Sequence, residues 1–231
     1  MPKAPQGLRP IRSYVLRQGR LTPGQQRAFT EHWPTYGLPF VEQPLVMTDV
    51  FGNEQPVYLE IGCGNGTALA EMARRHPERN YLGIEVHKPG VGHLLHTLAA
   101  QGSTNVRIFQ HDALDVLHQM IPNAALVGLY LFFPDPWHKK RHHKRRIVQP
   151  RFVDLVVQKL CSTGFVHMAT DWEPYAEHML TLLQASPALQ NTATEADYVP
   201  RPTDRPLTRF ERRGQALGHV VNDLVFRRVI D

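Results

Sequence analysis

Cysteines, long apolar runs and metal-ligand spacings are scarce or missing in this sequence. Its 231 residues include only two cysteines, Cys63 and Cys161, too few for a disulfide framework, so we expect a reducing compartment, the cytoplasm. The longest apolar run, residues 124–133, is too short to span a bilayer, and the N-terminal stretch has no apolar segment typical of a signal peptide. The 13 histidines form no complete ligand set with these cysteines. We therefore expect neither a membrane nor a metal partner.

Acidic residues are missing from the start of the chain. None precedes Glu31, whereas six lysines and arginines occur there. A second basic block, residues 139–146, holds six more lysines and arginines, in a chain whose formal net charge is +5. A charge run often only keeps a surface hydrated. Two separate blocks of the same sign instead favour an anionic partner such as a nucleic acid.

The middle of the chain alternates between strand and helix patterns. Short apolar runs typical of buried strands alternate with segments of helical periodicity from residue 56 to 169. This order predicts an α/β fold, a doubly wound and mostly parallel sheet that binds ligands at the carboxyl ends of its strands. We expect a basic arm and helical lead-in at 1–51, then a Rossmann-like domain at 52–231. The expected strands are 57–61, 81–86, 106–110, 125–133, 164–169, 192–198 and 220–229, and the expected helices are 67–76, 89–100, 115–121, 152–160 and 173–185.

Carboxylates recur where the expected strands end. In a parallel sheet they would gather along one edge, which would repel a phosphate and attract a cationic ligand. The five residues are Glu60, Glu85, Asp112, Asp135 and Asp171.

The loop after the first strand has glycine at alternate positions, Gly62, Gly64 and Gly66. It departs from a dinucleotide motif, which would need glycine in place of Thr67, and from a phosphate loop, which would need a lysine. A tight strand-to-helix turn alone would explain the glycines. However, Glu85 ends the next strand, where a carboxylate can accept hydrogen bonds from ribose hydroxyls. S-adenosylmethionine, with its ribose, sulfonium and ammonium groups, fits this pattern. Asp112 would then lie near the adenine, or would simply cap a helix.

The most informative stretch, residues 132–146, reads FFPDPWHKKRHHKRR. An apolar strand stops at a rigid Pro-Asp-Pro-Trp turn, and the second basic block follows at once. Asp135 and Trp137 are suited to holding a planar base, and the adjoining cations to holding phosphates. A stiff turn with a core tryptophan is the plainer alternative.

Five segments together resemble one enzyme family, the bacterial tRNA (guanine-N7-)-methyltransferases. They are RSYVLRQGRLTPGQ (12–25), LEIGCGNG (59–66), PDPWHKKRHHKRR (134–146), ATDWEPYA (169–176) and TRFERRG (208–214). The resemblance runs over nearly the whole chain, and the basic block and TRFE are its most specific parts. It implies a class I S-adenosylmethionine-dependent methyltransferase fold with seven strands, the last one antiparallel. It also implies that the enzyme methylates a guanine in the tRNA variable loop.

The resemblance also assigns roles to residues. It implies cofactor contacts at Glu60, Glu85, Asp112 and Asp135, with Asp135 catalytic as well. It implies substrate contacts at Lys139 and Asp171. The expected RNA contacts of the basic block are Arg141, His142, His143, Lys144, Arg145 and Arg146. The last expected substrate contacts are Thr208, Arg209, Phe210 and Glu211, although a threonine followed three residues later by a glutamate is also a helix capping box.

Two other functions stay open from the residues alone. One is a methyltransferase that acts on another substrate, because charge does not separate tRNA from DNA. The other is an RNA-binding module that has lost its chemistry, which the strand-end carboxylates disfavour. The sequence is compatible with a monomer or a homodimer.

Overall fold

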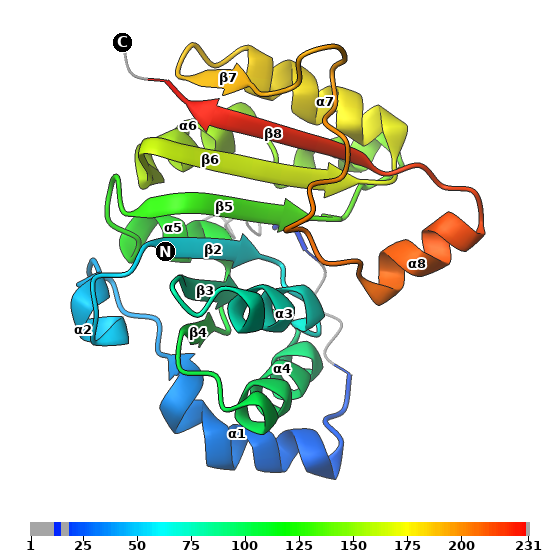
Figure 1. The fold of residues 1–231 in the computed structure, drawn as a ribbon. Coiled ribbons are helices and arrows are strands. Elements are labelled where there is room, and N and C mark those ends of the chain that lie inside the picture. Colours follow the sequence, from blue (N-terminus) through cyan, green and yellow to red (C-terminus); the bar gives the residue numbers. More distant parts are fainter. Residues whose placement is uncertain (1–11, 15–18, 230–231) are drawn as a thin grey trace, which may run out of the picture.

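The computed structural model describes residues 12–14 and 19–229, apart from the side chains of Arg209 and Phe210 (Figure 1). One mixed sheet runs through the molecule, with helices on both faces. The elements are α1 (Pro23–Tyr36), β1 (Gly37–Leu38), α2 (Met47–Phe51), β2 (Val57–Ile61), α3 (Thr67–Arg75), β3 (Asn80–Ile84), α4 (Lys88–Gln101), β4 (Val106–Phe109), α5 (Ala113–Gln119), β5 (Leu126–Phe132), the 3-10 helix η1 (Lys140–Arg145), α6 (Pro150–Lys159), β6 (Leu160–Thr170), α7 (Glu173–Gln184), β7 (Leu189–Asn191), α8 (Arg209–Ala216) and β8 (Asn222–Arg228).

The sheet has the expected topology with one additional strand. In the described residues its order is β1-β4-β3-β2-β5-β6-β8-β7, and β1 to β6 pair in parallel. The last strand, β8, pairs antiparallel with β6, which confirms the prediction of a mostly parallel sheet with an antiparallel last strand. Eight strands replace the expected seven because Gly37–Leu38 of the lead-in pairs with β4. Two residues are too few to give a strand pattern in the sequence.

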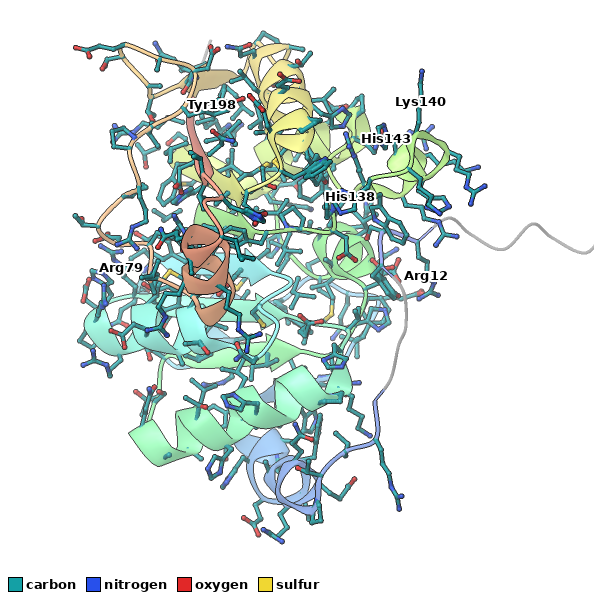
Figure 2. The ribbon with its side chains drawn as sticks, turned by 90° about the vertical axis from the view of Figure 1, so that its right-hand side faces the viewer. Arg12, Arg79, His138, Lys140, His143 and Tyr198 are labelled. Carbon is teal, nitrogen blue, oxygen red and sulfur yellow. The ribbon has the colours of Figure 1, made fainter. Side chains whose placement is uncertain are left out.

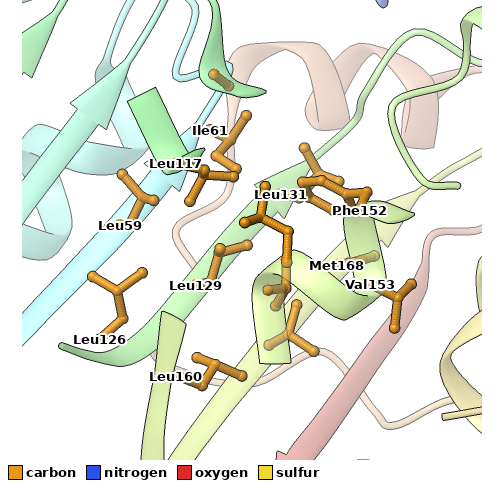
Figure 3. Packing of buried hydrophobic residues seen from close by; sticks show 14 of the residues in the cluster. Leu59, Ile61, Leu117, Leu126, Leu129, Leu131, Phe152, Val153, Leu160 and Met168 are labelled. Atoms are coloured by element: carbon orange, nitrogen blue, oxygen red, sulfur yellow. The ribbon is translucent and has the colours of Figure 1, made fainter. Parts of the chain in front are cut away.

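Each face of the sheet is covered by its own hydrophobic core. Successive side chains of a strand point to opposite faces, so Leu59 lies in one core and Tyr58 in the other. The larger core packs α5, α6 and α7 against the sheet, and Figure 3 shows part of it around Leu129 and Leu131. The second core packs α1, α3 and α4 on the opposite face. The strands are buried on both faces, which explains why they read as continuous apolar runs.

Most predicted element boundaries differ from the structure by one or two residues, whereas β6 begins four residues before the expected strand at 164–169 and one expected strand is misplaced. Residues 192–198 form no strand, and the strand of this region is the earlier β7, which ends at Asn191. The Asn191 side chain accepts a hydrogen bond from Ala193 N at 3.0 Å, which turns the chain. The helix expected at 115–121 begins earlier, at Ala113, since Asp112 accepts from Leu114 N at 3.0 Å and caps it. The differences at β7 and α5 thus come from side chains that accept hydrogen bonds from nearby backbone.

Candidate active site

An open cavity of about 210 Å³ lies at the carboxyl edge of β2, β3 and β5. This position is the one expected for a ligand site in a parallel sheet. Two of the five strand-end carboxylates, Glu85 and Asp135, line it directly. Other lining residues include Tyr14, Gly62, His111 and Phe133.

The glycine loop leaves its backbone open toward a ligand. Gly62 and Gly64 have φ angles of +71° and +58°, and a Cβ added at either would meet nothing within 4 Å. Gly66 differs, because an added Cβ would lie 2.3 Å from Leu94, so this third glycine serves packing between α3 and α4. We infer that only the first two glycines allow close approach of a ligand.

Glu85 is held by the backbone around it. One carboxylate oxygen accepts from Gly64 N at 2.6 Å, and the other accepts from Val86 N and His87 N at 2.8 Å each. A carboxylate has about four acceptor sites, two on each oxygen, so only the oxygen bound to Gly64 N can still accept another hydrogen bond. Glu85 therefore stands in a fixed orientation beside the glycine loop, with one acceptor site left for a ribose hydroxyl.

Glu60 lies beneath the same loop and is 3% exposed. Burial, and to a smaller extent the charge of Glu85, raises the pKa of Glu60 to about 8. Its Oε2 atom has no hydrogen-bond partner among the described residues. An unpaired buried carboxylate oxygen is costly, and a cationic ligand group would relieve that cost.

The N-terminal segment contributes to this cavity through residues that the sequence analysis missed. Ser13 and Tyr14 line the cavity, and the Tyr14 hydroxyl accepts a hydrogen bond from Arg12. Desolvation raises the pKa of Tyr14, and the nearby Asp112 raises it further. Asp112 therefore caps α5 and also lies beside a cavity residue, so the two interpretations of Asp112 are compatible. Tyr14 lies in the segment 12–25 that carries part of the family resemblance, but no role was assigned to it because it approaches the cavity from far away in the chain.

Asp135 stands in a strained turn after β5. Phe133 and Trp137, on either side of Pro134–Pro136, have positive φ angles of 51° and 48°. Non-glycine residues in this region cost about 1–3 kcal/mol each and concentrate at functional sites. The turn places the Asp135 carboxylate in the wall of the cavity; the residue as a whole is exposed, and partial desolvation of its carboxyl raises its pKa.

Trp137 connects this turn to the N-terminal segment. Its indole Nε1 donates to Ser13 O at 3.2 Å. The Arg145 guanidinium lies 5.0 Å from the centroid of the Trp137 ring, and His142 packs edge-on against it. The ring is thus already engaged, and we expect it to shape the turn more than to stack on a base.

Most of the second basic block forms η1 (Lys140–Arg145), which begins shortly after the turn that carries Asp135. Lys139, Arg141 and Lys144 are exposed, while His142, His143 and Arg145 are half-buried. In Figure 2, Lys140 points away from the molecule, and His138, His143 and Arg12 lie on the same side. A cationic surface therefore adjoins the cavity.

Arg146 differs from the other cations of the block. It is 4% exposed, and its Nε donates to Pro136 O at 2.9 Å. Its guanidinium lies 4.6 Å from the centroid of the Tyr175 ring. Unlike the other expected RNA contacts, Arg146 is therefore buried, and its contacts instead stabilise the turn that carries Asp135.

Asp171 follows β6, the neighbour of β5, and lies close to the same turn. His138 packs edge-on against Trp172, with 4.3 Å between ring centroids. The Asp171 Oδ2 atom lies 3.1 Å from Nδ1 of His219. Asp171 is not among the cavity-lining residues, so it stands beside the cavity, on the side of α8.

The TRFE segment begins α8. Thr208 caps the helix by accepting from Glu211 N at 3.1 Å, which is half of a capping box. The Glu211 side chain does not accept from the backbone of Thr208 as it would in a full capping box. Its carboxylate, 1% exposed, pairs with Arg205 instead. The side chains of Arg209 and Phe210 lie outside the described residues.

A family model described as "Putative methyltransferase" matches residues 54–224. The tRNA (guanine-N(7)-)-methyltransferase of Aeromonas hydrophila is 57% identical over 96% of this chain and 94% of its own length. Enzymes of the same name from Shewanella baltica and Aliivibrio salmonicida are each 56% identical over 96% of this chain and 93% of their own. The chain belongs to this family. The strand-end carboxylates and η1 are therefore parts of a tRNA (guanine-N7-)-methyltransferase family member.

Solved structures support the fold of this family member. A 16S rRNA methyltransferase, KamB, has a TM-score of 0.59 at 16% identity and covers 80% of this chain and 93% of its own. A SAM-dependent O-methyltransferase from Thermotoga maritima has a TM-score of 0.51 at 19% identity, covering 80% of this chain and 63% of its own. The chain thus has the class I methyltransferase fold.

The residues present fit S-adenosylmethionine. The open glycine backbone, the oriented Glu85 carboxylate and the unpaired Glu60 oxygen suit a cation that bears a ribose.

In the described part of the chain, no helix is both long and apolar enough to cross a membrane. The described residues also contain no group of three or more His, Cys, Asp or Glu side chains that could hold a metal ion.

Proposed function

We propose that this protein transfers a methyl group from S-adenosylmethionine to N7 of a guanine in the variable loop of tRNA. One observation carries the proposal: Asp135 and Ile147, which flank the basic block 139–146 in the chain, both line the cavity that Glu85 also lines. A cofactor bound in the cavity would thus lie next to RNA held by the basic block. The 57% identical relative, named for this reaction, supports the same conclusion.

The chemistry requires little of the protein besides position. When bound, S-adenosylmethionine supplies an electrophilic methyl group on its sulfonium. Guanine N7 has a free lone pair and no proton, so no general base is needed. Holding the reacting atoms in line can contribute about 7–11 kcal/mol to lowering the barrier. Glu60, Glu85 and Asp112 would hold the cofactor, with Gly62 and Gly64 permitting its close approach.

Asp135 and Asp171 would recognise and stabilise the base. A carboxylate can accept hydrogen bonds from guanine N1–H and the exocyclic amine. It also stabilises the positive charge that develops on guanine during methylation. Asp135 lines the cavity, and Asp171 stands beside it, so we assign the catalytic role to Asp135.

The cations of η1 would hold the RNA backbone near the cavity. In an A-form duplex the major groove is too deep and narrow for side chains to reach N7. We therefore expect the target guanine to lie in a loop or to be displaced from its stack. Efficient methylation of a guanine inside a continuous, perfect RNA duplex would contradict this expectation.

The test is to incubate the protein with unmodified bulk tRNA and labelled S-adenosylmethionine, and then to identify the modified nucleoside. We expect label in 7-methylguanosine. Label in another nucleoside, or labelling of DNA or protein in place of tRNA, would favour a different substrate. Cofactor binding without methylation of any of these would remove the proposed substrate, and no cofactor binding would favour an RNA-binding module. The cytoplasm remains our proposed location, and a monomer or homodimer our expected state.

A further inference from the structure

A buried charged cluster lies behind the proposed site and takes no part in the reaction described above. Arg205, 2% exposed, is at its centre. Its two terminal nitrogens bind both oxygens of Glu211, at 2.6 and 2.8 Å. Arg205 also donates to Oδ2 of Asp223 at 3.0 Å, and its Nε lies 2.7 Å from Oδ1 as an ion pair not aligned for a hydrogen bond. His167 Nε2 completes the cluster, 2.7 Å from the same Oδ1 atom.

The cluster joins elements that are far apart in the sequence. Asp223 and His167 belong to the paired strands β8 and β6, whereas Glu211 lies in the first turn of α8. The Arg205 guanidinium also lies 5.9 and 5.8 Å from the ring centroids of Phe132 and Phe133. These two residues directly precede the turn that carries Asp135. Arg205 therefore connects the start of α8 to the strand end beside the cavity.

The other end of α8 lies against the second strand-end carboxylate of this region. A Cβ added at Gly214 would lie 3.4 Å from Oδ2 of Asp171, and His219, just after the helix, contacts the same oxygen. Figure 1 shows α8 beyond the carboxyl ends of β5 and β6. The helix is thus fixed at both ends beside the proposed base-binding carboxylates.

A bidentate arginine–carboxylate pair fixes orientation as well as distance. We propose that Arg205 is a positioning residue for the tRNA substrate, which holds Glu211, and with it the first turn of α8, against the end of β5. Glu211 then acts through Arg205 and does not contact RNA. This inference rests on the proposed function, because it concerns how the same site receives tRNA.

The test is a double-mutant cycle with Arg205→Met, Glu211→Gln and the double variant. The measurements are kcat, KM for tRNA, and the Kd of S-adenosylmethionine. We expect each single change to raise KM for tRNA about tenfold. We also expect the two effects to be non-additive, because changes to coupled neighbours in one network deviate from additivity by roughly 2- to 150-fold. The double variant should be no worse than Arg205→Met. The Kd of S-adenosylmethionine should stay within about twofold, because neither residue lines the cavity.

Matched controls are Arg75→Met and Glu177→Gln, which make the same replacements at exposed positions on α3 and α7. They should leave KM for tRNA unchanged. If Arg205→Met does not fold, Arg205→Lys, which keeps the charge but loses the bidentate geometry, replaces it in the cycle. Effects of the two changes that multiply in the double variant would overturn the inference, as would a wild-type KM for the Arg205 variant. Failure of the wild-type protein to methylate tRNA would instead overturn the proposed function.

Discussion

At the scale of single residues, the account depends most on Asp135. Its carboxylate lines the cavity at the end of β5, between two residues with left-handed backbone. Replacing it with alanine should lower kcat about 100-fold or more, as removal of one group that stabilises developing charge does in other enzymes. The Kd for tRNA should change little, because the exposed cations of η1 remain.

The matched control is Asp154→Ala, which removes an exposed carboxylate on α6. The wild-type pH profile offers a second check. Because burial raises the pKa of Asp135, kcat should fall with decreasing pH at a value above the ordinary range for aspartate. A wild-type kcat in Asp135→Ala would remove its catalytic role.

Glu60 predicts a pH dependence of stability without cofactor. Its pKa is raised to about 8 when folded, mainly by burial, so folding takes up a proton between its unfolded pKa of about 4.3 and this value. The contribution of Glu60 to stability is therefore full below that window and is lost as the pH rises through about 8. Denaturant unfolding of Glu60→Gln should show a weaker loss of stability between pH 5 and 9. Parallel curves for the two proteins would contradict the assignment.

At the scale of elements, η1 should govern RNA affinity. Replacing Arg141 and Lys144 by alanine should weaken tRNA binding and flatten its salt dependence, by about 0.7–0.9 in log–log slope for each phosphate that the protein no longer neutralises. Filter binding at several salt concentrations measures both effects. Arg74 and Arg75 on α3 provide a control of equal charge. If the salt dependence of tRNA binding is unchanged in the η1 variant, η1 does not bind the RNA backbone.

Elements were predictable where local pattern decides them. The buried strands β2 to β6 read as apolar runs, and the carboxylates at their ends could be located from the sequence. The edge strand β1 could not, because its two residues pair with β4 only through tertiary packing. Similarly, Arg146 reads as one more surface cation, and only its contacts with Pro136 and Tyr175 show that it is buried.

At the scale of the whole molecule, the site joins segments that no local pattern relates. Tyr14 reaches the cavity from the N-terminal segment, and Arg205 joins α8, β8 and the end of β5. The family resemblance implied the roles of Asp135 and of the TRFE segment. It did not distinguish residues that contact the substrate from residues that only hold the site in place. Glu211 and Arg146 are both buried, so we propose that each supports the site and does not contact RNA.

Cofactor binding should stabilise the whole fold. At a concentration of 100 times its Kd, a ligand contributes about 2.7 kcal/mol, which corresponds to a rise in Tm of roughly 5–10 °C for a chain of this size. Thermal unfolding with and without S-adenosylmethionine measures this shift. Glu85→Gln should lose most of it relative to its own Tm, while Glu177→Gln should keep it. An equal shift in all three proteins would exclude Glu85 as a cofactor contact.

The central claim is that the cavity and η1 together direct methylation to one guanine N7 in a loop of tRNA. The most direct measurement treats unmodified tRNA with the enzyme and S-adenosylmethionine, then cleaves the RNA chemically at 7-methylguanosine and maps the break. We predict one enzyme-dependent break, in the variable loop, that is lost with Asp135→Ala. No break, or breaks distributed over helical regions, would contradict the account.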